Sequence, residues 1–390
     1  MRTDEGPLVS GYHAAEWLVW NWWRLLCEPR SASNGWDLAH CMASIGEGYV
    51  WPNITIWSDG LRTAIIPSPS SRPDAKPFRY IGGPATVIPS SIFADVLDSF
   101  IPKIIARLRL QNVSETNLDR LWSDVLVERA DPEISRCRRL EALLGLDPDS
   151  NSEQVISELV KDAETLGEPV VDELAAESAQ NRGQHVLSAA ALWHIAEEQG
   201  AEVVTKDVLR PYGELKVLRG PDVPAWKVGE TAARQIRSQE HLSAGLLSSA
   251  KLAEMAGASG DVLQPSSRGG SNVSFVFETS SKKARLVLRS KWATGRRFDL
   301  ARLIADRLFS DGGIVYPATR ANTYRQKAQR AFAAELLSPF GEVDDMVAGD
   351  FSEERKQEVA DYFDVSPLTI DTLLRNHGLP RDAETYTAIA

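Results

Sequence analysis

The sequence predicts an α+β protein of several domains, because helical and strand-like patterns alternate along a chain too long for a single core. The chain has 390 residues, of which 43% are hydrophobic and 25% are charged, as in an ordinary globular protein. We expect a Trp-rich α+β domain over residues 1–145, an acidic helical domain or linker over 146–222, a mainly helical domain with a small sheet over 223–340, and a last helical unit over 341–390.

The first domain is marked by its tryptophans, seven of which lie between positions 17 and 57. Residues 14–26 have helical periodicity that places Trp17, Trp20 and Trp23 on one face, and Pro29 ends the pattern. We interpret the tryptophans as core residues. The alternative is a platform on which a base or a sugar stacks.

A β-hairpin and two helices complete this domain. Residues 54–58 and 62–66 alternate as strands around Asp59 and Gly60, a pair that favours a type I′ turn. Amphipathic patterns predict helices over residues 92–110 and 118–127.

The middle of the chain predicts three helices, over residues 153–166, 170–180 and 186–199. This part is acidic: from Asp147 to Glu202 there are 13 Asp or Glu residues against two basic ones. The stretch from Lys282 to Arg330 is its opposite, with 13 Lys or Arg against three acids. Either the two blocks are solvated faces, or they attract each other, or the basic block meets an anionic partner.

In the last part of the chain, helical and strand-like patterns alternate again. Helices are expected over residues 224–237, 246–255, 298–309 and 324–337, with strands over 272–277 and 285–289. A final helix over 368–376 has Ser366 as its N-cap and Pro367 at its first position.

Three blocks in this part carry a family resemblance. The first two are Gly229, Ala233, Arg237 and then Leu252, Ala253, Gly257, each at helical spacing. The third pairs Arg296-Arg-Phe-Asp-Leu-Ala-Arg-Leu-Ile-Ala-Asp306 with Gln326-Lys-Ala-Gln-Arg-Ala-Phe-Ala-Ala-Glu-Leu-Leu-Ser-Pro339, and residues 359–375 follow. In this order they resemble the ImmA/IrrE family of metallopeptidase-like domains. The resemblance implies a zincin-like fold over about 223–340 and a helix-turn-helix-like end over 341–390.

The zinc chemistry of that family is missing from the matching positions. The active-site helix of the family reads Arg-Arg-Phe-Thr-Leu-Ala-His-Glu-x-Gly-His, whose histidines bind zinc and whose glutamate activates water. At these positions this chain has Arg302, Leu303 and Asp306, and Gln326 stands for the third ligand. We therefore expect no catalytic residue, no metal and no cofactor.

Two roles are open for the residues that replace the zinc site. Arg302 and Asp306 are four residues apart on a helix and can pair, with Gln326 bonded to either, so that a polar cluster joins the two helices. Alternatively, four arginines present a basic cleft to a partner, and these are our candidate binding residues: Arg296, Arg297, Arg302 and Arg325.

The resemblance implies a function without catalysis. Active family members cut helix-turn-helix repressors, so we expect a sensor, adaptor or regulatory binding subunit in bacterial phage defence, mobile-element or stress regulation. Its partner would be a protein such as a helix-turn-helix regulator or a defence-system subunit. One alternative is an active zinc metallopeptidase with unconventional ligands, and another is a nucleic-acid-binding regulator that uses segment 282–330.

The terminal helix and the general composition bear on partners and location. The helix over 368–376 offers Asp371 with Asp361 and Asp364 nearby, which repels phosphate and favours a packing or protein-contact role. No apolar run reaches the roughly 20 residues that span a bilayer, and the first ten residues lack the apolar core of a signal peptide. With three unpaired cysteines, we expect a cytoplasmic protein.

Overall fold

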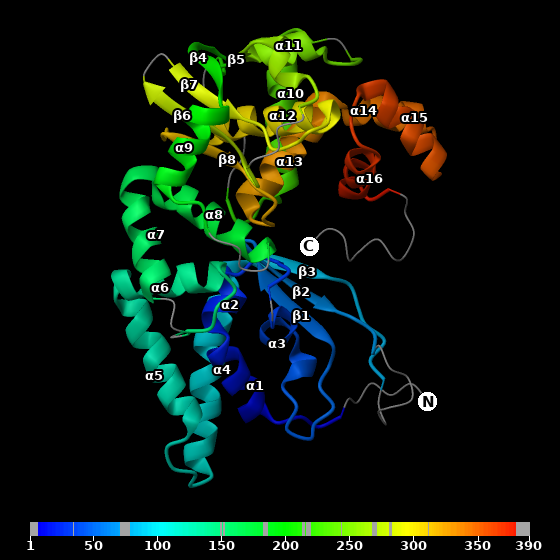
Figure 1. The fold of residues 1–390 in the computed structure, drawn as a ribbon. Helices are drawn as coiled ribbons and strands as arrows, with labels where there is room; N and C mark the ends of the chain where they lie inside the picture. The colour runs from blue at the N-terminus through cyan, green and yellow to red at the C-terminus, as the bar shows by residue number, and fades with distance from the viewer. Residues whose placement is uncertain are drawn as a thin grey trace.

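The computed structural model describes residues 7–379 except 34, 71–78, 149, 151–152, 182–185, 213–214, 216–219, 243, 267–270, 281–282 and 311. Within these residues the fold is α+β, with one antiparallel sheet of three strands and one of five. Figure 1 shows the N-terminal residues in the lower half and the C-terminal residues in the upper half, with a column of helices along the left side.

The N-terminal part packs helices against a three-stranded sheet. Its elements are α1 (Gly11–Trp20), α2 (Trp22–Cys27), α3 (Trp36–His40), η1 (Met42–Ser44), β1 (Ile54–Ser58), β2 (Arg62–Pro67), β3 (Thr86–Pro89), α4 (Ser90–Leu110) and α5 (Asn117–Ala130). The expected helix over 14–26 is interrupted at Asn21, whose side-chain amide donates to the carbonyl of Trp17 at 2.9 Å.

Most of the tryptophans are core residues, as expected. Trp22, Trp36, Trp51 and Trp57 are each at most 7% exposed. Trp20 is 56% exposed and so is not a core residue, because the buried face of α1 is formed by Ala15, Leu18 and Val19.

The hairpin forms at the expected place with a different turn. Ser58 lies opposite Thr63, so four residues, 59–62, lie between the last pair of the ladder. Only Gly60 has a positive φ, of 98°, whereas a type I′ turn needs two such residues, and the prediction of that turn is wrong. The carboxylate of Asp59 closes the turn instead, since it accepts from the backbone amides of Leu61 at 3.2 Å and Arg62 at 2.9 Å.

The middle helices are α6 (Pro132–Leu143), α7 (Glu153–Leu166), α8 (Glu168–Gln180) and α9 (Ala189–Gln199). The last three confirm the expected ones, while α6 was not expected. It begins after Asp131, whose side chain accepts from two first-turn amides. Leu174 of α8 and Leu192 of α9 share one core with Phe275 and Phe277, so these helices pack on the second sheet.

The second sheet crosses the domain boundary expected between residues 222 and 223. Its strands, in spatial order, are β5 (Ala256–Ala258), β4 (Ala201–Val208), β7 (Lys283–Val287), β6 (Ser274–Ser280) and β8 (Val315–Ala318). Strand β4 precedes the boundary, yet Val203 pairs with Ala284 of β7. A strand cannot satisfy its backbone alone, so segments 146–222 and 223–340 are one packing unit here.

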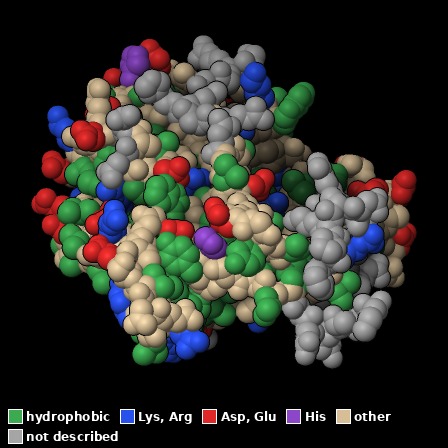
Figure 2. All heavy atoms as spheres, turned by 90° about the horizontal axis from the view of Figure 1, so that it is seen from below, with side chains coloured by type: hydrophobic (Ala, Val, Ile, Leu, Met, Phe, Trp, Pro, Cys, Tyr) green, Lys and Arg blue, Asp and Glu red, His purple; other side chains and the backbone are tan. Residues whose placement is uncertain are grey.

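One face of the molecule carries side chains of mixed character. On the face seen from below, Lys and Arg side chains are scattered among acidic and apolar ones and form no single patch (Figure 2). No helix in the described ranges has both the length and the apolar character required to cross a membrane.

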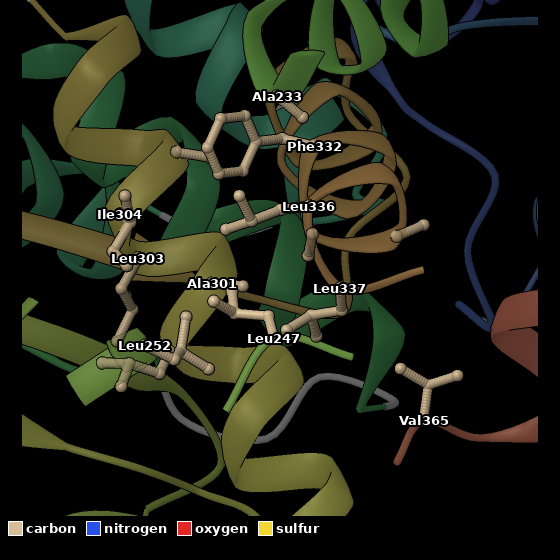
Figure 3. Close-up of a cluster of buried hydrophobic side chains, with 14 of the residues drawn as sticks. Ala233, Leu247, Leu252, Ala301, Leu303, Ile304, Phe332, Leu336, Leu337 and Val365 are labelled. Atoms are coloured by element: carbon tan, nitrogen blue, oxygen red, sulfur yellow. The ribbon is translucent and has the colours of Figure 1, made fainter. Parts of the chain in front are cut away.

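The C-terminal helices are α10 (Ala225–Gln239), α11 (Ser249–Met255), η2 (Gly260–Leu263), α12 (Ala293–Phe309), α13 (Tyr324–Leu337), α14 (Phe340–Val347), α15 (Glu353–Phe363) and α16 (Pro367–Asn376). Figure 3 shows the core that they enclose, in which Phe332 and Leu336 of α13 lie between Ala233 of α10 and Ala301 of α12. Phe332 is fully buried, so α13 is the central helix of this part.

Helices α10 and α13 approach closely at Gly229. A Cβ atom there would lie 2.2 Å from the carbonyl oxygen of Ala328 and 2.6 Å from the amide nitrogen of Phe332. Both contacts are to backbone, which cannot rotate away as a flexible side chain can. The glycine is therefore required by helix packing.

We expect Gly229→Ala to lower the free energy of unfolding by about 1–3 kcal/mol or more, because the added methyl group must push the two helices apart. Urea denaturation of the purified chain measures this. Gly341→Ala is the matched control: Gly341 lies in α14, and a Cβ atom added there would have no neighbouring atom within 4 Å, so the substitution should be neutral or slightly stabilising. Equal effects at both sites would contradict the role given to helix packing.

Candidate functional site

Helices α12 and α13 bring Arg302 and Gln326 together, as the sequence predicts. The guanidinium of Arg302 donates to Oε1 of Gln326 at 2.6 Å, and it also donates to the carbonyl of Thr319. The amide of Thr319 donates to the same Gln326 oxygen at 2.9 Å. Arg302 is 3% exposed and Gln326 is fully buried, so this contact is an interior one.

Asp306 does not pair with Arg302. Its two carboxylate oxygens each accept from the guanidinium of Arg325 at 2.6 Å, and Gln329 donates to one of them at 2.7 Å. The acid beside Arg302 is Asp299, 3.6 Å away. Arg325 can offer both its donors to one carboxylate, a geometry that an i,i+4 partner on the same helix does not reach here.

Both guanidiniums are affected by burial, with opposite overall results. Burial lowers the pKa of Arg302, and the nearby Asp299 only partly compensates. Burial also works against the charge of Arg325, but the contact with Asp306 outweighs it and raises the pKa of that group. The guanidinium of Arg325 therefore stays charged at any ordinary pH.

Leu303, which the sequence resemblance would align with a catalytic glutamate, lies in the apolar core. It is 2% exposed, and Figure 3 shows it beside Ile304 and Leu252. With Val276 and Leu286 of the sheet it borders a gap of about 20 Å³. No group of three or more His, Cys, Asp or Glu side chains suited to a metal ion occurs in the part of the chain that the structure describes.

The four candidate arginines do not line a common cleft. Arg296 donates to the carbonyls of Val262 at 2.7 Å and Ser290 at 2.9 Å. Arg297, 1% exposed, donates to the carbonyl of Leu247 at 2.7 Å and pairs with Asp364 at 3.2 Å. With the bonds of the buried Arg302 and the half-buried Arg325, these contacts tie neighbouring segments to α12 and α13.

Part of the basic stretch pairs with the acidic stretch of the same chain. Arg320 pairs with Glu177 at 3.2 Å, and Arg285 lies 3.7 Å from Glu202. The hydroxyl of Thr323, the N-cap of α13, donates to the carboxylate of Glu173 at 2.8 Å. Of the alternatives left open by the sequence, internal attraction between the two blocks is the one that these contacts realise.

The last two helices pack as a unit, with α16 turned toward the interior. Ser366 caps α16 as expected, accepting from the amide of Thr369. Thr369 is 7% exposed, and Asp371 pairs with Lys356 of α15 and with Arg375, each at 2.9 Å. These contacts agree with packing, one of the two roles expected for this helix.

A cleft of about 570 Å³ adjoins the polar cluster, and no pattern in the sequence predicts it. Its walls come from the β1–β2 hairpin and from the first turns of α10, α12 and α16, with α13 at its base. Its charged and aromatic lining residues are Trp57, Asp59, Arg62, Trp226, Arg289, Trp292, Phe298, Asp299, Lys327 and Arg330. The N-terminal and C-terminal parts of the chain thus meet around one hollow.

Two of the four cations in this cleft have no acidic partner. Lys327 pairs with Asp59 at 3.2 Å, and Arg289 lies 3.7 Å from Asp299. Arg62 and Arg330 have no carboxylate within 4 Å among the described residues; instead they donate to the backbone carbonyls of Val87 at 3.4 Å and Ala321 at 3.0 Å.

The cations of the cleft also lower the pKa of one another. Burial lowers the pKa of Arg330 to about 9, and the neighbouring Arg302 adds to the effect. Burial lowers the pKa of Lys327 as well, against the influence of Asp59, and Arg330 and Arg62 lower it further. The guanidinium of Arg330 is still charged at neutral pH, so positive charge is concentrated in a chain whose net charge is -11.

The sequence indicated some of the residues that line this cleft, but not the cleft itself. Arg289, Lys327 and Arg330 belong to the basic stretch, although the binding residues expected from the sequence are other arginines of that stretch. Trp57 is one of the tryptophans for which stacking was an alternative; it is 2% exposed, with the ammonium of Lys327 4.5 Å from its ring centre. Arg62, at the start of β2, gave no signal because only the folded chain brings the hairpin to α13.

Breaking the pair of Asp306 and Arg325 should destabilise the protein strongly. In Arg325→Met the carboxylate of Asp306, which is fully buried, keeps only Gln329 as a donor, so we expect a loss of about 3–5 kcal/mol in the free energy of unfolding. The double variant Arg325→Met, Asp306→Leu should recover most of it. As a control, Arg120→Met removes an arginine whose side chain is 70% exposed and should change stability by less than about 0.5 kcal/mol. If the double variant is no more stable than the single one, the pair is not the cause.

A pH dependence follows from Glu173. Burial raises its pKa to about 7, although Arg325 and the hydroxyl of Thr323 oppose the shift. The folded state then binds more protons than the unfolded state between about pH 4.5 and 7, so this group makes stability fall as pH rises through that window. Glu173→Gln should remove the fall and gain about 1–3 kcal/mol at pH 8 relative to pH 5, at about 1.4 kcal/mol per pKa unit. Urea denaturation at both values measures it, with the exposed Glu197→Gln on α9 as control; equal slopes for all three chains would refute the assignment.

Comparison of this chain with protein-family models, with curated proteins and with solved structures found no match.

Proposed function

We propose that this chain is a non-catalytic binding protein, a sensor, adaptor or regulatory subunit, in which α12 and α13 retain an ImmA/IrrE-like arrangement without its zinc. The observation that supports this most is the buried contact between Arg302 and Gln326. It lies where the resemblance would place a metal ion.

The donor atoms around that point are already in use. A guanidinium has no lone pair to offer zinc, and its charge opposes a cation. The Oε1 atom of Gln326 accepts from both Arg302 and the amide of Thr319. The carboxylate of Asp306 accepts three hydrogen bonds. An ion would have to displace all of these before it gained a ligand, and Leu303 offers no base to activate water.

The cleft next to this cluster is the binding site that the geometry favours. It is concave, lies where several elements meet, and combines apolar walls with a few charged groups, as ligand sites do. Helix α16 forms part of its wall, so an occupant would contact the helix-turn-helix-like unit directly. A regulator that responds to phage, mobile elements or stress could use such an arrangement to change its contact with a protein partner.

The contacts give less support to the two alternatives. An unconventional metallopeptidase requires ligands that the described residues do not group together. A nucleic-acid binder requires an exposed basic surface, whereas Arg297, Arg302 and Arg325 of segment 282–330 are engaged in the interior.

Metal analysis of the full chain tests the proposal. After dialysis against a mild chelator we expect far less than one zinc ion per chain by elemental analysis, and a thermal midpoint that does not respond to EDTA. The quadruple variant Arg302→His, Leu303→Glu, Asp306→His, Gln326→Glu restores the ligand types of the family and should take up zinc where the parent does not. One tightly held zinc ion per parent chain would overturn the proposal, and a folded quadruple variant without zinc would overturn the alignment to the family.

A further inference from the structure

The cleft between the hairpin and α13 is electrostatically incomplete. Of its four cations, Arg62 and Arg330 lack an acidic partner within 4 Å among the described residues, while the two acids of the cleft, Asp59 and Asp299, already serve other groups. Charge that is partly withdrawn from water without a counter-charge costs free energy. An anion in the cleft would remove that cost.

Unused hydrogen-bond donors point the same way. The indole Nε1 of Trp57 and the Nε of Arg62 are both buried and have no acceptor in the structure. Most buried donors in proteins are satisfied, and these two lie in residues of the same cleft wall. Opposite them, α10 begins at Ala225 with no side chain capping its first turn, and a helix start of this kind adds partial positive charge.

The cleft also offers flat apolar surface. Trp292 is 76% exposed, whereas most large aromatic side chains of this protein are covered. Trp226 and Phe298, both half-buried, line the same hollow. A planar ring such as a nucleobase stacks favourably on such side chains.

We propose that this cleft binds a nucleoside phosphate, with its phosphate at Arg62, Lys327 and Arg330 and its base against Trp292 or Trp226. The four cations exceed the two acids by two charges, which a phosphomonoester, at about -2, balances and a single carboxylate does not. The volume of about 570 Å³ lies in the range of roughly 300–1,000 Å³ typical of small-molecule sites. The nucleotide would be the ligand of the proposed binding protein, so this step rests on that function.

Calorimetric titration of the full chain with adenosine 5′-monophosphate, guanosine 5′-monophosphate and their diphosphates tests the proposal. At least one should bind ten-fold or more tightly than adenosine or guanosine, which lack the phosphate, and than inorganic phosphate, which lacks the ring. Arg330→Met should weaken binding about ten-fold or more, because a hydrogen bond to a charged group contributes about 1.5–3 kcal/mol. Arg120→Met, far from the cleft in sequence and absent from its lining, should leave the affinity unchanged.

Trp292→Ala keeps the test decisive if Arg330→Met does not fold, since so exposed a side chain contributes little to the core. It should weaken nucleotide binding and leave the weak binding of inorganic phosphate as it is. The absence of nucleotide binding at millimolar concentration, or binding that neither variant weakens, would overturn the inference. So would inorganic phosphate binding as tightly as the nucleotides. Zinc content is independent of these results: a zinc-bound chain that also bound nucleotide would refute the metal-free function alone.

Discussion

The buried ion pair between Asp306 and Arg325 is the constraint on which the rest of the structure depends. Asp306 is fully buried, and a buried carboxylate is tolerable only while its hydrogen bonds are complete. Arg325 and Gln329 supply them from α13, so α12 and α13 are held at one separation and one rotation. That placement brings Arg302 against Gln326. A polar cluster thus joins the two helices.

The first two turns of α13 carry this constraint to the rest of the chain. The amide of Tyr324 donates to the carbonyl of Asp59 in the hairpin at 2.8 Å, and Lys327 pairs with the carboxylate of the same residue. Arg325 also donates to the carbonyl of Pro169, at the start of α8, at 3.1 Å. Three segments far apart in sequence therefore meet at one helix end, and two of them, the hairpin and α13, line the cleft.

The distribution of arginines follows from the same arrangement. Arg296, Arg297 and Arg302 donate mainly to backbone carbonyls of segments that run past α12. Carbonyls at the ends of strands and loops need donors when they are buried, and a guanidinium with five N–H groups can serve several at once. Part of a basic stretch of sequence is thereby used in the interior.

The sequence by itself determined the local elements, because these depend on periodicity and on capping within a few residues. The helices at 153–166 and 324–337 begin and end where the apolar spacing predicted, and Ser366 caps the last helix as expected. Tertiary structure decided what depends on distant partners. Strand β4 was not predicted from the sequence, because it forms by pairing with the distant β7. Asp306 pairs with Arg325 and not with Arg302, because the guanidinium of Arg325 on the facing helix donates to both carboxylate oxygens. The cleft pairs Lys327 with Asp59 across 268 positions, a separation at which no local pattern in the sequence carries information about contact.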